Sequence, residues 1–578
     1  MIVPYLRAFY RLAYKSIIFI LGPRKPTLPL ERVLPQASCS ASITLSTHSK
    51  SGPIDATFIR LSLPKALYSF LAVWVTANVL LTRQQYYLHD TPSIVQCTSS
   101  PWEDWPPDSC GIRGTLCEQD LNRLEGSSLR CMGCSDIQLG NPRWIGGQKI
   151  NHQPVIVGGG DKDRTYRADS WLCPSAIHSG LISSQMGGCV TFHALPFPSL
   201  FSPFVNSSAN KLTSQGFTPS FPGAFRLLKE DASGCLDLHW IMTAFNSTCL
   251  AITTLFLRPP PALLFSLLFF LGFFQISLFS NPPSYPPDWE QLLSRFLPSS
   301  LIAYWIYKQS FCITLPAFRK LPFEVTILQG ASYWLGVESS TIFANFPITR
   351  LGYDPLDPAG IIALICVIII VIGVVGIQWW EFRRLALVQY YLIRYLPLIP
   401  IFIVLSFIPD YSLRPHHYML ALLAIPLLSL PNRVSLCLQA FMLGLYLDGV
   451  CRWGYASILE SNESLLGDAD SGSWVPEFWQ NSSTSTMLYW SGIGNDLKSA
   501  NVSEYSILLN DIQVSGNYTQ TYINISSLDI DIHKDNYFRI AYMANGSSLD
   551  FSNPITRWKN GTWNWVEAGF SSDNGTIS

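Results

Sequence analysis

The chain alternates between long apolar runs and long polar segments. The clearest apolar run is 360–379, which contains the stretch ICVIIIVIGVVGI and no charged residue. A helix of about 20 apolar residues is long enough to cross a bilayer. The pattern predicts about seven transmembrane helices, at 66–82, 261–280, 298–315, 360–379, 395–409, 418–430 and 435–447. The run at 322–342 is interrupted by Glu324 and Glu338, so the pattern leaves open whether it also crosses.

The charges around the first run set its orientation. Residues 1–65 contain nine Lys or Arg against Glu31 and Asp55, and 66–82 then carries no charge. Basic segments stay in the cytosol, so 1–65 is predicted to be a cytosolic leader and 66–82 a signal-anchor. The alternative is a cleaved signal peptide, which usually lies much nearer the start of a chain. Seven crossings then place the C-terminus on the opposite, luminal or extracellular side.

Glycosylation sequons provide an independent test of this sidedness. Asn-x-Ser/Thr occurs ten times, and every occurrence falls in a segment that the seven-helix arrangement assigns to the non-cytosolic side. The candidates are Asn206, Asn246, Asn462, Asn481, Asn501, Asn517, Asn524, Asn545, Asn560 and Asn574.

Two exported regions flank the multi-pass region at 261–450. The first, 84–250, contains a cluster of nine cysteines from Cys97 to Cys249, which is typical of an oxidising compartment. The second, 452–570, shows alternating apolar and polar residues at 505–514, 522–532 and 537–543, which predicts a small β-sandwich with Trp558, Trp563 and Trp565 in its core. Residues 571–578 are predicted to be a disordered tail.

The stretch YRADSWLCPSAIHSGLISSQMGGCV at 166–190 carries the most specific pattern. Leu172, Ala176 and Ile177 have helical spacing around Cys173, with Asp169 or Ser170 suited to cap the start. Gly180 is expected to end the helix, and the glycine pair at 187–188 to form a tight turn. This stretch resembles the LCCL module, a small secreted fold known from cochlin and factor C. With the cysteines that precede it, the chain is similar to fungal multi-pass membrane proteins that carry an LCCL domain.

The resemblance implies a disulfide-bonded α+β domain. It implies that Cys131 and Cys134 join partners that include Cys173, although spacing alone leaves the connectivity open. The disulfide candidates are Cys110, Cys117, Cys131, Cys134, Cys173, Cys189 and Cys235. A zinc site at Cys131-x-x-Cys134 would need a second ligand pair, and an exported thiol pair is usually oxidised. Cys249 and Cys451 are a hypothetical further pair, since each is predicted to lie just outside the membrane.

No catalytic, cofactor or metal motif is recognised, and a near-neutral net charge of −1 with 13% charged residues argues against nucleic-acid binding. His178 is interpreted mainly as a structural residue. As binding residues we expect the 161–167 loop and the His178 edge, namely Asp161, Arg164, Tyr166 and His178. Asp448 and Arg452, four residues apart, are expected to pair.

The sequence therefore predicts a non-enzymatic multi-pass glycoprotein of the plasma membrane, vacuole or endomembranes. It would display an LCCL-like domain that binds a glycan, a lipid or a protein. The alternative is a transporter or membrane enzyme regulated by its exported domains. A polar cluster at the bilayer midplane would favour the alternative.

Overall fold

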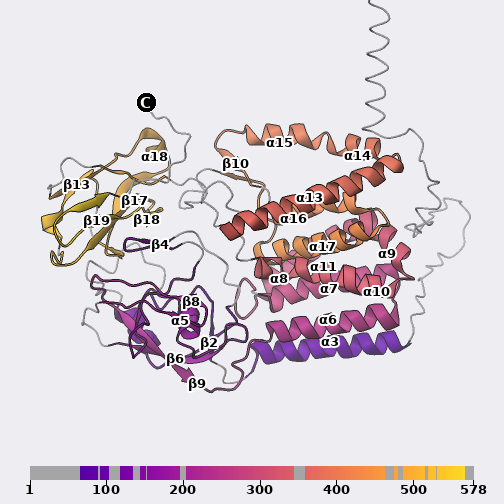
Figure 1. Cartoon of the computed structure of the whole chain (residues 1–578), viewed down its shortest axis with the longest axis horizontal. Coiled ribbons are helices and arrows are strands. Elements are labelled where there is room, and N and C mark those ends of the chain that lie inside the picture. Colours follow the sequence, from indigo (N-terminus) through magenta and orange to yellow (C-terminus); the bar gives the residue numbers. More distant parts are fainter. Residues whose placement is uncertain are drawn as a thin grey trace, which may run out of the picture. The chain divides into compact units, whose positions relative to one another are not determined.

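A computed structural model describes residues 65–88, 92–102, 118–134, 143–150, 153–195, 203–280, 282–343, 358–414, 416–461, 474–479, 486–514, 518–528 and 530–565. The chain divides into two compact units (Figure 1). The helical unit comprises Met1–Tyr87, Leu238–Leu351 and Pro355–Leu459. The strand-rich unit comprises Leu88–Asp237, Gly352–Asp354 and Glu460–Ser578.

Most helices of the helical unit run side by side (Figure 1). They are α3 (Lys65–Tyr86), α6 (His239–Ile252) with η2 (Thr253–Leu257), α7 (Pro261–Leu278), α8 (Trp289–Ile306) with η3 (Tyr307–Phe311) and α9 (Cys312–Phe318), α10 (Pro322–Glu324) with η4 (Val325–Gln329) and α11 (Gly330–Val337), α12 (Ser339–Ile342), α13 (Pro358–Arg384), α14 (Val388–Tyr395), α15 (Leu398–Ser406), α16 (His417–Ala424) with η6 (Ile425–Leu428), and α17 (Arg433–Trp453). The short strands β10 (Tyr411–Leu413) and β11 (Leu459–Ser461) accompany them.

Within the described residues, six helices are long and apolar enough to cross a membrane: Lys65–Tyr86, His239–Leu257, Pro261–Leu278, Ile361–Arg384, Val388–Ser406 and Arg433–Trp453. The helix His239–Leu257 was not predicted. It begins within the region assigned to the exported domain, so the compact strand-rich segment ends at Asp237 rather than near residue 250. The predicted spans 298–315 and 418–430 lie in helices outside these six.

Helix α17 packs closely against α11 through two glycines. A Cβ on Gly336 would lie 2.2 Å from the Phe441 carbonyl oxygen, and one on Gly444 would lie 2.5 Å from the Val337 nitrogen. Neither position can carry a side chain without moving backbone. Small residues that let helix backbones approach are the usual basis of helix association in membranes.

The first part of the strand-rich unit is a five-stranded sheet in the order β1-β2-β6-β9-β5. Its strands are β1 (Ser93–Val95), β2 (Ser128–Cys131), β6 (Gly188–Ala194), β9 (Ala224–Glu230) and β5 (Tyr166–Arg167). Around the sheet lie α4 (Glu118–Leu124), α5 (Leu172–His178) and the strand pairs β3 (Arg143–Ile145) with β4 (Gln148–Ile150), and β7 (Ser208–Ala209) with β8 (Leu212–Thr213).

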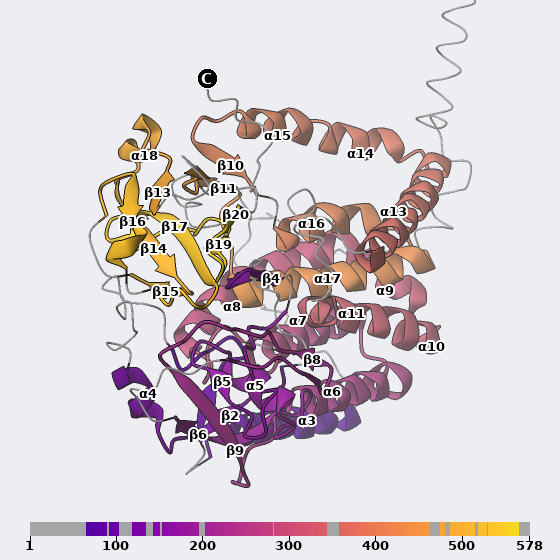
Figure 2. The same cartoon turned by 60° about the vertical axis from the view of Figure 1, so that its left-hand side comes forward.

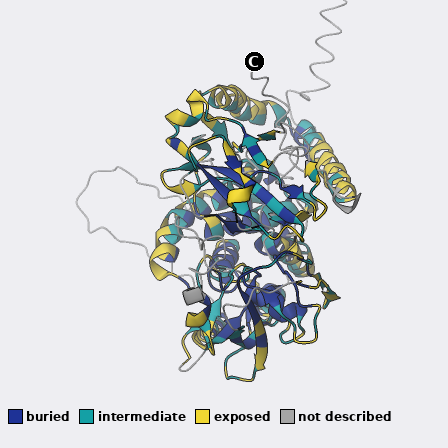
Figure 3. Ribbon diagram, turned by 90° about the vertical axis from the view of Figure 1, so that its left-hand side faces the viewer, coloured by how far each residue is buried: buried dark blue, intermediate teal, exposed yellow. Residues whose placement is uncertain are grey.

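The C-terminal part consists of two sheets that share one apolar core. The smaller contains β12 (Phe478–Trp479), β13 (Met487–Trp490) and β16 (Tyr522–Asn524). The larger contains β14 (Val502–Leu509), β15 (Ile512–Gln513), β17 (Asn536–Ala544), β18 (Ser547–Ser548), β19 (Ile555–Arg557) and β20 (Trp563–Trp565). The short helices α18 (Asn495–Ser499) and η8 (Ile525–Ser527) join strands. Buried positions follow the strands of the unit (Figure 3).

Of the three predicted core tryptophans, Trp563 packs against this core and Trp558 is 39% exposed, while the side chain of Trp565 lies outside the described residues. Trp490, which was not singled out, is instead the largest buried side chain of this core. Part of the sequence prediction lies outside the described residues: the leader before residue 65, Cys110, Cys117, the sequons at Asn462, Asn481, Asn517 and Asn574, and the 571–578 tail.

Candidate functional site

Three disulfides between described residues hold the first part of the strand-rich unit together. Cys131 pairs with Cys173, Cys97 with Cys134, and Cys189 with Cys235. The Cys131–Cys173 bond ties strand β2 to helix α5, which agrees with the partner set that the resemblance implied. Cys97 was missing from the disulfide candidates, because it stands apart from the motif cysteines.

Helix α5 lies at the centre of this framework, and all seven of its residues are buried. Its predicted side-chain cap is absent, because Trp171 occupies the N-cap position and makes no capping hydrogen bond. The hydroxyl of Ser170 donates instead to the Val157 carbonyl oxygen and accepts from the Val157 N–H at 3.0 Å. The helix ends where predicted, with Gly180 at a φ of 80° directly after the last turn.

His178 is a buried structural residue rather than a surface group. It is 0% exposed, its Nδ1 lies 2.8 Å from the Tyr166 hydroxyl, and its Nε2 lies 3.2 Å from both the carbonyl and hydroxyl oxygens of Ser207. Burial lowers the pKa of His178; the Ser207 hydrogen bond opposes this shift and the Arg164 charge adds to it. Tyr166 is equally buried, and burial raises the pKa of its hydroxyl. Neither His178 nor Tyr166 can contact a ligand on the surface, which corrects their prediction as binding residues.

The loop before β5 is a structured turn. Asp161 accepts from the Thr165 N–H and hydroxyl, both at 2.7 Å, and Arg164 donates to the Gly159 carbonyl oxygen at 2.9 Å. The two remaining predicted binding residues, Asp161 and Arg164, therefore form hydrogen bonds within the loop that fix its conformation. The side chains that the loop presents to solvent are those of Lys162 and Asp163.

Arg167 joins this part to the C-terminal sheets. Its guanidinium is 1% exposed and binds both carboxylate oxygens of Asp169, at 2.7 and 2.6 Å. Its Nη1 donates to the Asp511 carboxylate at 2.9 Å, and its Cζ lies 4.2 Å from the centroid of the Phe217 ring and 4.6 Å from that of the Phe221 ring. The two carboxylates keep the pKa of Arg167 above its ordinary value, although burial alone would lower it.

Further contacts reinforce the connection between the two parts of the strand-rich unit. The Gly146 N–H donates to the same Asp511 oxygen at 2.8 Å, and the Tyr537 ring covers the glycine pair between β3 and β4. Ile512 belongs to the apolar core around β6 and β9. The turn between β14 and β15 therefore inserts into the disulfide-bonded part, and the two parts form one compact unit.

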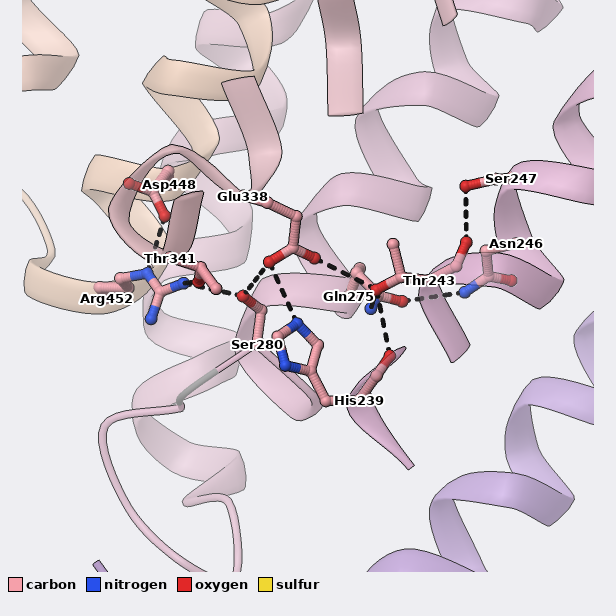
Figure 4. A network of polar contacts seen from close by, with 10 residues as sticks. All are labelled: His239, Thr243, Asn246, Ser247, Gln275, Ser280, Glu338, Thr341, Asp448 and Arg452. Atoms are coloured by element: carbon pink, nitrogen blue, oxygen red, sulfur yellow. Dashed lines mark hydrogen bonds and ion pairs between the residues drawn. The ribbon is translucent and has the colours of Figure 1, made fainter. Parts of the chain in front are cut away.

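The helical unit contains a buried polar network that connects α6, α7, α12 and α17 (Figure 4). Glu338, at the end of α11, is 1% exposed. Its carboxylate lies 3.1 Å from His239 Nε2 and accepts from the Ser280 hydroxyl at 2.7 Å and from the Thr243 hydroxyl at 3.3 Å. A carboxylate taken out of water is costly unless it is paired and hydrogen-bonded, and here both oxygens are used.

The network continues in two directions from Glu338. Towards α17, Arg452 Nη2 donates to Ser280 at 2.8 Å, and its Nε donates to Asp448 at 2.7 Å, which confirms the predicted pair. Asp448 is 0% exposed and also accepts from the Ser339 hydroxyl at 3.0 Å.

In the other direction the chain of bonds reaches α3. Gln275 donates to Thr243 at 2.9 Å and accepts from Asn246 at 3.0 Å. Asn246 accepts in turn from Trp74 Nε1 at 2.8 Å and from Asn78 at 3.2 Å. The sequence prediction missed this network. The sequence does contain a signal for the network, because several apolar helices each hold an ionisable or amide residue. An ionisable residue within a membrane helix is by default a candidate functional residue.

Two sequence predictions fail inside the helical unit. Asn246 is 1% exposed and its amide nitrogen donates to Gln275, so it cannot carry a glycan. Cys249 and Cys451 are both free thiols and buried, so the hypothetical staple between them is wrong. The sulfur of Cys451 instead faces the Phe273 carbonyl oxygen on α7, at 3.7 Å.

Five other sequons lie in described parts of the strand-rich unit. All five asparagines are exposed: Asn206, Asn501, Asn524, Asn545 and Asn560. Across the described residues, no three His, Cys, Asp or Glu side chains lie together in a way that could hold a metal ion.

Comparison with known proteins agrees with the cysteine framework. Residues 120–221 match the family model of the LCCL domain. An uncharacterised protein of Saccharomyces cerevisiae is 26% identical over 479 residues, which cover 74% of this chain and 69% of that protein. No solved structure matches the chain significantly. The match encloses α5, β5, β6 and the Cys131–Cys173 bond, and it shows that this chain carries an LCCL domain.

Proposed function

We propose that the chain is an integral membrane protein that presents its strand-rich unit, including the LCCL domain, on the non-cytosolic side for ligand binding or adhesion. The observation that carries this proposal is the set of three disulfides in the segment between α3 and α6. Disulfides form and persist in oxidising compartments. A domain attached at both ends to apolar helices is held close to the membrane surface.

The helix order supports a specific topology. Besides the six long apolar helices, we assign crossings to the continuous segments 289–318, 322–337 and 417–428, which gives nine. The connections after the second, fourth, sixth and eighth crossings then fall on one side. These connections and the helix ends that flank them carry the basic residues Arg258, Arg319, Lys320, Arg383, Arg384 and Arg433. An excess of Lys and Arg marks the cytosolic side.

One ion pair supports this assignment. Arg433, at the start of α17, binds both oxygens of Glu324 in α10 at 2.8 Å, so two connections assigned to the cytosol do lie together. An odd number of crossings places both parts of the strand-rich unit opposite the basic leader. The five exposed sequons then share one compartment, while the buried Asn246 lies within a crossing.

Glycosylation and binding assays on the full-length protein test this function. Replacing Asn501 or Asn560 by Gln should each remove one glycan, whereas Asn246→Gln should remove none. Purified protein is then applied to glycan and lipid arrays beside a Cys131→Ser/Cys173→Ser double variant. A ligand retained by the wild type and lost by the double variant supports the proposal. Equal retention by both, or absence of glycans, contradicts it.

The buried polar network favours a second candidate function, which is proton-coupled transport. His239, Glu338 and Asp448 are ionisable groups linked by hydrogen bonds inside the helical unit. Proton relays in pumps and transporters use such chains. Proton flux into liposomes that contain the wild type, with Glu338→Gln inactive and Glu324→Gln active, would support transport over display. Absence of flux in all three would leave the network a structural element.

A further inference from the structure

A groove runs along the surface of the helical unit between α3 and α7. Asn246 of α6 accepts from Trp74 of α3 and donates to Gln275 of α7, and the three helices are labelled in Figure 2. The groove has a volume of about 590 Å³, within the range of about 300–1,000 Å³ that ligand pockets have. We call it the α3–α7 groove, and most of its lining residues are apolar, among them Leu71, Val75, Val79, Phe270, Leu271 and Phe274.

The α3–α7 groove is open to the surroundings of the helical unit. On its rim, Val75 is 62% exposed, Val79 is 63% exposed and Phe270 is 45% exposed. Both helices that carry these residues are long and apolar enough to cross a membrane. In a membrane this side of the unit would face lipid hydrocarbon and not water, so an occupant of the groove comes from the bilayer.

The polar atoms in the middle of the groove already have partners within the protein. Asn78 donates to the Trp74 carbonyl oxygen at 2.9 Å and to Asn246 at 3.2 Å, and Thr82 donates to the Asn78 carbonyl oxygen at 2.8 Å. Gln275 both donates and accepts within the polar network. Here the walls therefore offer an occupant apolar contacts and no spare hydrogen-bond donor.

One end of the groove is different, because it carries a cation. Arg83 lies in the last turn of α3, is exposed, and has no hydrogen bond or ion pair through its guanidinium with another described residue. Tyr87 lies one turn further on, and its hydroxyl accepts from Trp289 Nε1 at 2.7 Å. Tyr and Trp gather at the headgroup level of a bilayer, and Arg is well suited to binding phosphate.

The depth of the groove matches one leaflet of a bilayer. Along α3, the distance from Leu71 to Arg83 is about 18 Å at about 1.5 Å per residue. Half of a hydrocarbon core of about 30 Å is about 15 Å. An acyl chain in the groove would therefore place its headgroup at Arg83.

The charges at this end select the kind of headgroup. Asp288 and Glu290 flank Trp289 at the start of α8, and both are exposed. These carboxylates would repel a headgroup of net negative charge. A quaternary ammonium group would be attracted to them and can also pack on an aromatic ring. With Arg83 for the phosphate, the end suits a headgroup that carries both charges.

We infer that the α3–α7 groove binds one zwitterionic diacyl phospholipid, with an acyl chain between the helices and its phosphate on Arg83. In the proposed topology this lipid belongs to the non-cytosolic leaflet. The inference rests on the proposed function only in requiring that the helical unit lie in a membrane.

Native mass spectrometry of the full-length protein, released from detergent with added lipid, tests the inference. The wild type should hold one molecule of dioleoylphosphatidylcholine. It should bind dioleoylglycerol, which has the same chains and no phosphate, about tenfold more weakly, and dioleoylphosphatidylglycerol should also bind more weakly. Arg83→Gln should weaken binding of the phosphatidylcholine about tenfold and leave that of dioleoylglycerol unchanged, whereas Arg83→Lys should retain most of it.

Two matched controls separate the groove from the remaining apolar surface. Val75→Trp places a large ring in the groove and should weaken the binding of both lipids. Val73→Trp, two residues earlier on α3 and 69% exposed, lies outside the groove and should match the wild type. Lys320→Gln removes an exposed cation at another helix end and should also match it.

Three results would overturn the inference. The first is equal binding of dioleoylphosphatidylcholine and dioleoylglycerol by the wild type, and the second is equal binding by Val75→Trp and Val73→Trp. The third is binding that appears only after residues 1–64 are removed, because the chain itself would then fill the groove. Since detergent-solubilised protein has no sides, failure here is distinct from failure of the proposed function, which glycosylation of Asn501 reports.

Discussion

The connection between the LCCL domain and the C-terminal sheets can be broken at one side chain. Asp511 stands in the turn between β14 and β15, and one of its oxygens accepts from the Gly146 N–H at 2.8 Å and from Arg167 Nη1 at 2.9 Å. Asp511→Ala removes both bonds. Arg167 remains paired with both oxygens of Asp169, so its charge is not left alone.

The structure sets the size of the expected effect. A hydrogen bond to a charged group contributes about 1.5–3 kcal/mol. Two such bonds are lost, and water entering the vacated space recovers part of the loss, so we expect about 2–4 kcal/mol. Since about 1.4 kcal/mol is a factor of ten in an equilibrium constant, local opening should become about 30- to 1,000-fold more frequent.

Hydrogen exchange followed by mass spectrometry on the full-length protein measures this opening. Peptides that cover β3 and β4 should exchange faster in Asp511→Ala by that factor, while peptides of the helical unit should be unchanged. Asp511→Asn keeps an acceptor for Gly146 and should show a smaller effect. Asp163→Ala, in the solvent-facing loop, is the matched control. Exchange within twofold of wild type at β3 and β4 would refute the reasoning.

Three further predictions concern other parts of the chain. The Cys131→Ser/Cys173→Ser double variant should lose about 2–5 kcal/mol in the free energy of unfolding of the strand-rich unit, measured by denaturant titration, and an unchanged midpoint would contradict a structural role. Because burial lowers the pKa of His178, the stabilisation by this residue is complete above the unfolded pKa of about 6.5 and falls as the pH drops below it. His178→Gln should therefore make the melting temperature less dependent on pH between pH 7.5 and 5. The same dependence on pH in the variant and the wild type would rule this out. Arg452→Ala leaves Asp448 buried without its partner and should cost about 3–5 kcal/mol, seen as reduced thermal stability in detergent, whereas Asp448→Asn/Arg452→Gln should cost less; equal losses would argue against charge pairing.

Local patterns predicted the LCCL domain well. The helix at α5 and its end at Gly180 depend on residues close together in the sequence, whereas the pairing of Cys173 with the Cys131 region, 42 residues away, was implied by the resemblance to the LCCL module. Gly187 illustrates why such patterns hold: it has a φ of 62°, and a Cβ there would lie 2.2 Å from the Cys131 carbonyl oxygen. Glycine is the residue that fits such a position.

Features that depend on distant partners could not be predicted. Helix α6 was missed because His239, Thr243 and Asn246 interrupt its apolar pattern, and only the structure shows that Glu338, Gln275 and Trp74 bind them. Likewise, Asp511 and Arg167 are separated by 344 residues, and no local pattern relates them. The interpretation of His178 as a mainly structural residue agrees with its burial, and its inclusion among the binding residues failed because a sequence does not show which side of a short helix is buried.

The central claim is that the disulfide-bonded LCCL domain and the C-terminal sheets share the non-cytosolic side. The most direct measurement uses a chain in which Asn501 is the one remaining sequon, with a C-terminal tag, in sealed microsomes treated with protease from the cytosolic side. The account predicts a glycosidase-sensitive chain whose C-terminal tag is protected until the membrane is opened. An unglycosylated chain whose tag is digested in intact microsomes would contradict it.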